Sequence, residues 1–140
     1  MLVDAILDTS VPTVDRDHTA LHAARLMKQR SVGTVVVIDE KGRPVGLLTD
    51  RDIALKIVGA RRGAETPVDE IMSHPVYAVS QDILVFDALR EMARRHVHRL
   101  PVVDRKKKLV GIVYAEDALL LLTAELANVA EVMANPRKTS

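Results

Sequence analysis

The sequence contains no cysteine and no tryptophan. Without cysteine, the chain cannot form a disulfide, bind zinc through thiolates or carry out thiol catalysis. Aromatic residues make up only 2% of the 140 residues, so a core must be built from aliphatic side chains and methionine. The same scarcity excludes the aromatic stacking platforms on which many single-strand nucleic-acid binders depend.

The sequence also has little net charge and no long apolar run. Its formal net charge is +1, which provides no overall attraction to nucleic acid or to acidic membranes. The longest apolar run, Ala118 to Leu122, is far below the ~18 residues that a membrane span needs. The first residues, MLVDAILDTS, carry acids where a signal peptide needs basic residues. We therefore expect a soluble, cytoplasmic protein with no membrane partner.

What the sequence does contain is an internal repeat. Aligning residues 3–57 with residues 68–122, an offset of 65 positions, pairs 18 identical residues without a gap. About 3 or 4 identities are expected by chance at ordinary residue frequencies. With 48% apolar and 28% charged residues, the composition is typical of a globular protein. The repeat therefore predicts that each half of the chain folds into a similar unit.

Each half predicts the same order of elements, β-α-β-β-α, so the expected fold class is α+β. An extended lead-in containing proline, SVPTV or HPVYAV, precedes an amphipathic helix over residues 17–30 or 81–95. Two β-branched strands follow, TVVVID with VGLL and RLPVVD with VGIV, joined by the polar turns EKGRP and RKKK. A closing helix is predicted over residues 52–58 or 116–133, and Gly59 is placed to end the first of these.

One such unit of about 60 residues would expose too much apolar surface by itself. We therefore expect the two repeats to pack sheet to sheet with pseudo-twofold symmetry, as one compact module. The expected divisions are residues 1–62 for the first repeat with its lead-in, 63–128 for the second, and 129–140 for the helix end and tail. The tail NPRKTS, residues 135–140, is expected to be disordered.

The stretch GLLTDRD, residues 46–52, runs from a buried strand into a polar cluster at a helix start. A helix N-terminus offers free backbone N–H groups and a partial positive charge. There the Asp52 carboxylate can accept two hydrogen bonds from a ribose diol, and the Thr49 hydroxyl can bond ribose or phosphate. Thr49 or Asp50 can also cap the helix. We expect Asp50 to cap it, which leaves Asp52 free for a ligand.

The stretch HVHRLPVVD, residues 96–104, is the second candidate, because His98 and Arg99 precede a buried strand. Arginine can clamp a phosphate with two parallel hydrogen bonds, and a neighbouring histidine adds a donor. The alternative is a solvated loop. His96 and His98 have no evident third ligand, so no metal site is predicted. The basic turn RKKK, residues 105–108, is expected to be a solvated hairpin turn.

Two segments, ARLMKQRSVGTVVVIDEKGRPVGLLTDRDI and LREMARRHVHRLPVVDRKKKLVGIVYAEDA, resemble the cystathionine-beta-synthase (CBS) domain, which occurs in pairs called Bateman modules. The resembling signatures are PVVD…LVGIV and G-h-h-T-x-x-D, where h is apolar, and the resemblance extends to about residue 125. It implies a stand-alone pair of CBS domains that binds an adenosine ligand such as AMP, ADP, ATP or S-adenosylmethionine. Such a module needs no cofactor, does no chemistry and reports its ligand to an effector partner.

The resemblance further implies one composite nucleotide site that draws on both halves. The ribose would lie on the first half's polar motif, the base against the second lead-in, and the phosphate near His98 and Arg99. The expected ligand-binding residues are Leu47, Thr49, Arg51, Asp52, Val76, Tyr77, Val97, His98 and Arg99.

The pseudo-symmetric site is expected to be weaker, empty or occupied by a different ligand. Gly33-Thr34 stands where the second half has His98-Arg99, and Tyr114 replaces the threonine of the first half. The expected residues of this second site are Val11, Thr13, Val32 and Asp117.

The sequence predicts a sensor of adenine nucleotide, with AMP favoured, rather than an enzyme. It shows no P-loop, nucleophile–base pair or metal triad. The alternatives are a structural or interaction module with a vestigial site and, as a minor option, a nucleic-acid binder. Residues 118–133, ALLLLTAELANVAEVM, are apolar around much of their helix, which predicts a homodimer through the closing helices. In the family, two modules pack through such helices into a disc-like dimer.

Overall fold

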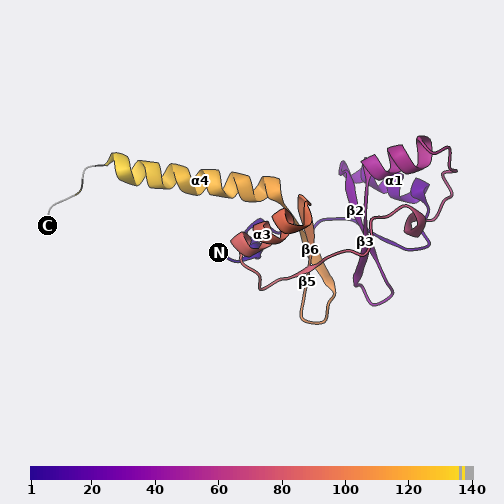
Figure 1. The fold of residues 1–140 in the computed structure, drawn as a ribbon, viewed down its shortest axis with the longest axis horizontal. Coiled ribbons are helices and arrows are strands. Elements are labelled where there is room, and N and C mark those ends of the chain that lie inside the picture. The colour runs from indigo at the N-terminus through magenta and orange to yellow at the C-terminus, as the bar shows by residue number, and fades with distance from the viewer. Residues whose placement is uncertain (136, 138–140) are drawn as a thin grey trace.

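The computed structural model describes residues 1–135 and 137. Positions 136 and 138–140, which belong to the predicted disordered tail, lie outside the described residues. The chain forms two three-stranded sheets accompanied by helices (Figure 1). The predicted α+β class with two β-α-β-β-α repeats is thereby confirmed.

The elements of the two repeats follow one another in the same order. The first repeat contains Thr13–Asp15 (β1), Ala20–Arg30 (α1), Thr34–Ile38 (β2), Pro44–Thr49 (β3), Asp50–Ile53 (α2) and the π-helical turn Ala54–Val58 (η2). The second contains Val79–Ser80 (β4), Val85–Arg95 (α3), Arg99–Val103 (β5), Leu109–Tyr114 (β6) and Ala115–Ala134 (α4). The 3-10 turns Val3–Ile6 (η1) and Val68–Glu70 (η3) precede the repeats. The bounds of α3, β5 and β6 equal those of α1, β2 and β3 shifted by the 65 positions of the sequence repeat.

In each sheet the middle strand pairs in parallel with the short lead-in strand and antiparallel with its hairpin partner. Alternate residues of β2, Val35 and Val37, point into the core that α1 covers. Val36 between them and Ile112 of β6 are fully buried but belong to neither core. They occupy the opposite faces of their sheets, so these faces are buried between the two repeats.

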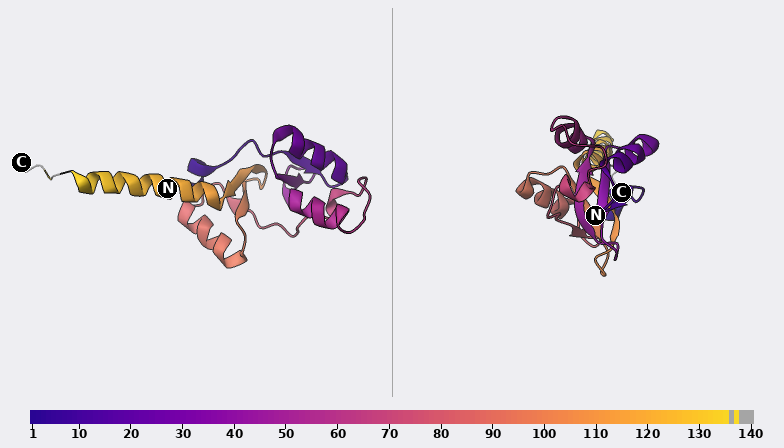
Figure 2. Two further views of the ribbon diagram at one scale, coloured as in Figure 1. Left: turned by 90° about the horizontal axis from the view of Figure 1, so that it is seen from above. Right: turned by 90° about the vertical axis from the view of Figure 1, so that its right-hand side faces the viewer.

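The lead-ins are exchanged between the repeats. Val3 of η1 packs in the core of the second repeat, whereas Val68 and Ile71 pack in the core of the first. Figure 2 shows the N-terminal segment beside the second repeat before the chain passes to the first. Two further bridges connect Asp8 with Ile112 and Leu47 with Ser73. The divisions expected after residues 62 and 128 stay predictions, but packing unites the repeats more closely than chain order suggests.

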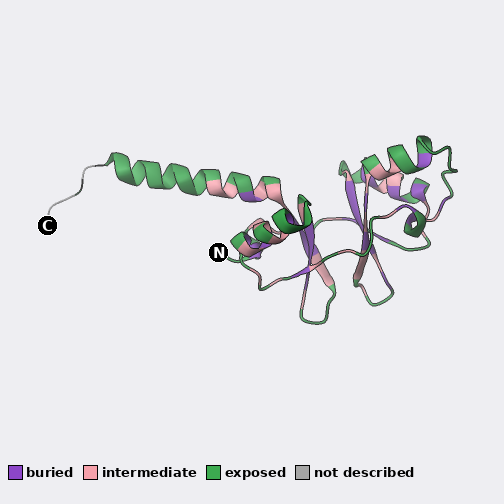
Figure 3. Cartoon of the chain, viewed as in Figure 1, coloured by how far each residue is buried: buried purple, intermediate pink, exposed green. Residues whose placement is uncertain are grey.

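The closing helix of the second repeat, α4, projects from the module (Figure 1). Its first turns contact α3 and β6, and Ala118 is fully buried. Farther along, the helix is exposed on all sides, as the green colour in Figure 3 shows. No helix in residues 1–135 is long and apolar enough to cross a membrane.

The end of the first closing helix differs from the prediction. Gly59 was expected as a left-handed terminating residue, but its φ is −65°, and Arg61 takes the left-handed conformation with φ of 56°. The amide of Gly59 donates to the carbonyl of Ala54 at 2.8 Å, which closes a π-helical turn. Because this bond forms with ordinary right-handed backbone angles, the position does not need glycine for its φ, although a Cβ there would lie 2.9 Å from the carbonyl oxygen of Leu55.

Candidate functional site

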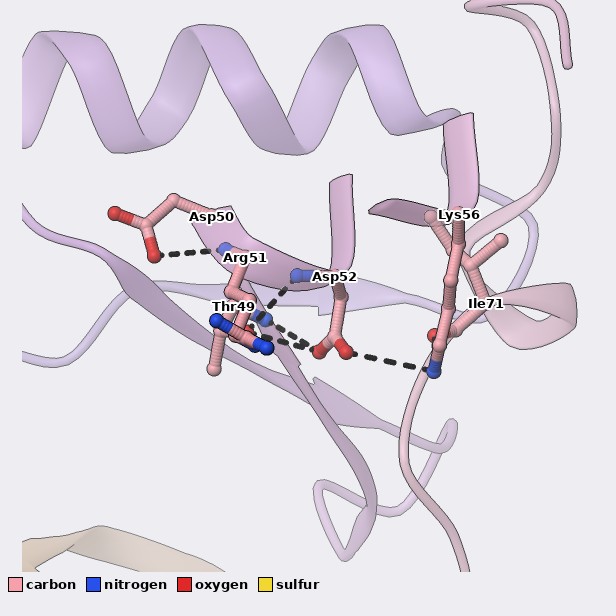
Figure 4. Close-up of polar contacts among 6 residues, drawn as sticks. All are labelled: Thr49, Asp50, Arg51, Asp52, Lys56 and Ile71. Carbon is pink, nitrogen blue, oxygen red and sulfur yellow. Dashed lines mark hydrogen bonds and ion pairs between the residues drawn. The ribbon is translucent and has the colours of Figure 1, made fainter. Parts of the chain in front are cut away.

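The polar cluster of GLLTDRD forms the first turn of α2. Thr49 is its N-cap: the Thr49 hydroxyl accepts a hydrogen bond from the Asp52 amide at 3.2 Å. In return, Asp52 Oδ2 accepts from the Thr49 amide at 2.9 Å, which completes a capping box (Figure 4). The expectation that Asp50 caps the helix was wrong. The Asp50 carboxylate points away from this pair and accepts only from the amide of Arg51, at 2.9 Å.

The Asp52 carboxylate is therefore already engaged. Besides the cap, its Oδ1 lies 3.4 Å from Lys56 Nζ, and Lys56 also donates to the carbonyl of Ile71 at 2.9 Å. Lys56 thus connects the start of α2 to the exchanged lead-in that follows η3. A ribose diol at Asp52 would share the carboxylate with this lysine and with the backbone of the cap.

Two adjoining cavities lie between the repeats. One, of about 260 Å³, extends along the second lead-in past Val76 and Tyr77. The other, of about 430 Å³, opens at the start of α2 beside Thr49 and Arg51. Both are lined by Leu47, Ser73, Val97 and Arg99. The two cavities together bring every predicted ligand-binding residue to one place except Asp52.

Several lining residues were missed by sequence reasoning, and Arg95 is the clearest. Its guanidinium lies 3.3 Å from the centroid of the Tyr77 ring, in a cation–π contact that fixes the ring at the cavity wall. The motifs gave no signal for Arg95, since it lies in the last turn of α3, where a basic residue is expected for the helix dipole alone. Ser73, Asp50 and His96 line the cavities as well.

Arg99 connects the cavities to the first repeat. Its Nη1 donates to the hydroxyl of Thr34 at 2.8 Å, across the junction between the sheets. The Arg99 guanidinium also lies 5.9 Å from the ring centroid of Tyr114, its partner in the β5–β6 register. A cation is thus held at the point where the two cavities meet.

The residues predicted for the weaker second site line neither of these two cavities. The site differs from the first at Tyr114, which is the N-cap position of α4 but makes no side-chain cap. Burial raises the pKa of the Tyr114 phenol, and the charge of Asp8 raises it further, while Arg99 acts in the opposite direction. Because Tyr114 makes no side-chain cap, the capping box at the start of α2 has no equivalent at the start of α4.

The described residues contain no cluster of three or more histidine, cysteine, aspartate or glutamate side chains placed to hold a metal ion. The cavities instead combine apolar walls with hydroxyls, helix-start amides and three arginines, Arg51, Arg95 and Arg99. Such a site suits a ligand with a flat apolar part and an anionic part.

Comparison with known proteins assigns the chain to a family. The model of the CBS domain family matches residues 3–59 and again residues 68–124. The CBS domain-containing protein YhcV of Bacillus subtilis is 42% identical over 111 residues, which cover 79% of this chain and 78% of YhcV.

Two solved structures are similar in fold. The CBS domain pair of protein MJ0100, in complex with 5′-methylthioadenosine and S-adenosyl-L-methionine, has a TM-score of 0.78 and 28% identity, covering 89% of this chain and 98% of that one. The cytosolic domain of the Mg²⁺ channel MgtE, in complex with ATP, has a TM-score of 0.74 and 29% identity, covering 86% of this chain and 48% of that one. The repeat, the paired sheets and the family match lead to one conclusion: this chain belongs to the CBS domain family and carries two copies of the domain.

Proposed function

We propose that the protein is a regulatory sensor that binds an adenine nucleotide between its repeats and acts through an effector partner, without chemistry of its own. AMP is the favoured ligand, with ADP, ATP and S-adenosylmethionine as alternatives. The observation that carries the proposal is the convergence of Leu47, Thr49 and Arg51 from one repeat with Tyr77, His98 and Arg99 from the other. The similar structures that hold adenosine ligands support the same class.

The proposed orientation follows the chemistry of the walls. The adenine base lies in the apolar cavity against Val76, Tyr77 and Val97. The ribose lies at the start of α2, near Leu47, Thr49 and Arg51, where helix-start amides and the hydroxyl offer hydrogen bonds. Asp52 completes the ribose contact by exchanging part of its bond to Lys56 for the diol. The 5′-phosphate reaches His98 and Arg99.

A second, weaker site is proposed at Val11, Thr13, Val32 and Asp117. The half-buried phenol of Tyr114 stands where the first site has the small hydroxyl of Thr49. At the equivalent position of the second site, Thr34 also provides a hydroxyl in place of the Arg99 guanidinium of the first site. The expected stoichiometry is therefore one tightly bound nucleotide per chain.

Thermal unfolding in the presence of candidate ligands tests the proposal. A ligand that binds only the native state raises the unfolding midpoint, by an amount equivalent to ~2.7 kcal/mol at a hundred times its Kd. We expect a rise with AMP, measured beside ADP, ATP, S-adenosylmethionine and NAD. If none of them changes the midpoint, the sensor proposal fails and a structural module with a vestigial site takes its place.

We further propose a cytoplasmic homodimer that forms through the closing helices. On α4, apolar residues recur at alternating spacings of three and four positions, so they line one side of the helix. This apolar side, called the seam below, is the kind of surface through which two helices pair. Leu119, Leu126, Val129 and Met133 of this seam are between 56% and 76% exposed, and Leu122 is half-buried. A helix that displays so much apolar surface gains most by covering it with a second copy.

A further inference from the structure

Thr34 is a buried polar residue at the start of an otherwise apolar strand. It opens β2, the run Thr34–Ile38, and is only 5% exposed. Burying a hydroxyl is unfavourable unless the hydroxyl is hydrogen-bonded. The Thr34 hydroxyl is satisfied by Arg99, which lies 65 positions away in the other repeat and occupies the equivalent place in the sequence repeat.

The contact uses only part of the capacity of Arg99. A guanidinium has five N–H donors in a rigid plane, and one nitrogen, Nη1, donates to Thr34 at 2.8 Å. Among the described residues, none of the ion pairs within 4 Å involves Arg99. The remaining donors and the full positive charge are therefore available to a ligand at the junction of the two cavities.

The bond to Thr34 also restricts the position of the Arg99 guanidinium. An unrestrained arginine loses up to ~2 kcal/mol of side-chain conformational freedom when a ligand immobilises it. A bond to a buried, β-branched residue orients the guanidinium before the ligand arrives, which lowers the cost of binding an anion. The Tyr114 ring, with its centroid 5.9 Å away, flanks the same guanidinium.

We propose that Thr34 is a positioning residue that holds Arg99 as the anion-binding group, so that the site takes 5′-phosphorylated adenosine rather than a 5′-thioether of adenosine. This inference rests on the proposed function and specifies its ligand class. A phosphate oxygen gains two charge-assisted hydrogen bonds from a preset guanidinium. A neutral thioether gains none, and a sulfonium group is repelled by the same charge.

Calorimetric titration of the full chain with AMP and with 5′-methylthioadenosine tests the inference. We expect the wild type to bind AMP more tightly than the thioether. Thr34→Val keeps the shape and removes the acceptor, so its affinity for AMP should fall about tenfold, while its affinity for the thioether stays within about twofold. Thr34→Ser, which restores the hydroxyl, should bind AMP nearly as the wild type does.

Two further variants separate positioning from folding. Arg99→Lys keeps the charge but loses the planar fork, so it should weaken AMP selectively, and adding Thr34→Val to it should cost little more. If Thr34→Val does not fold, Thr34→Ala, which also removes the hydroxyl, takes its place in the comparison.

The outcomes are distinguishable. The lack of a selective loss of AMP affinity in the Thr34 variant would overturn the inference, as would a wild type that binds the thioether as tightly as AMP. Both results leave the adenosine site itself standing. A wild type that binds neither compound overturns the proposed function, and the inference with it.

Discussion

At the scale of single residues, the first turn of α2 shows that the carboxylate proposed to bind the ribose already has a structural role. The Asp52 carboxylate bonds the amide of Thr49, in the capping box, and Lys56. The spacing Thr-x-x-Asp before an apolar run is the sequence signature of such a capping box. The prediction missed this signature and chose Asp50, which is equally suited by residue type.

Changing Asp52 to Ala tests both roles. We expect nucleotide binding to be lost and the free energy of unfolding to fall by about 1 kcal/mol, because the capping box is broken. Calorimetry with AMP and urea denaturation measure the two effects. Asp50→Ala is the matched control and should leave the cap intact. Unchanged AMP affinity in the Asp52 variant would show that this carboxylate is only a cap.

A second residue-scale prediction concerns Asp39, in the turn between β2 and β3. Its carboxylate accepts from the amides of Arg43 and Lys41, at 3.0 and 2.9 Å, and from Arg43 Nε at 2.8 Å. These bonds, with that of the Arg43 amide foremost, hold the pKa of Asp39 below its ordinary value of 3.8. Because the folded pKa is the lower one, its stabilisation is present above the unfolded pKa and is lost as the pH falls through the folded pKa.

Asp39→Asn should therefore lower the free energy of unfolding at neutral pH, and its difference from the wild type should shrink toward about pH 3. Urea denaturation of both proteins between about pH 7 and pH 3 measures this trend. A difference that stays constant over the range would contradict the role of the ionised carboxylate.

At the scale of elements, the exchanged lead-ins explain why glycine recurs at positions 46 and 111. Each glycine lies on an edge strand that the lead-in of the other repeat crosses. A Cβ at Gly111 would come within 2.5 Å of the carbonyl oxygen of Asp8. At Gly46 it would meet the flexible side chain of Met72 instead. The recurrence was visible in the sequence, but its cause is a contact between distant segments.

Gly111→Ala should consequently lower the free energy of unfolding by ~1–3 kcal/mol, since the backbone of the lead-in must move aside. Gly46→Ala is the matched comparison and should lose less, because the end of a methionine can shift. Urea denaturation of both variants gives the two values. Equal losses at the two positions would argue against backbone crowding as the cause.

At the scale of the whole molecule, the exposed seam of α4 predicts the assembly. Leu126 is 68% exposed at the middle of the seam, and Asn128 lies off it. In the proposed dimer, Leu126→Glu would remove a contact worth about 2 kcal/mol from each copy and introduce a charge, so this variant should be monomeric at micromolar concentration. Light scattering measures the mass. Asn128→Glu adds the same charge off the seam and should stay dimeric, and a dimeric Leu126→Glu would exclude this seam.

The sequence by itself determined the repeat, the order of the elements, the bounds of the hairpin strands to within one residue, and the two motifs that approach the cavities. The elements follow from local periodicity, and the repeat follows from the 65-position offset, so neither needs knowledge of how the halves pack. Only the tertiary structure decided which lead-in covers which repeat, that Lys56 also bonds the carbonyl of Ile71, and that Arg99 bonds Thr34. These contacts join residues far apart in the chain, so neither residue type nor local spacing predicts them.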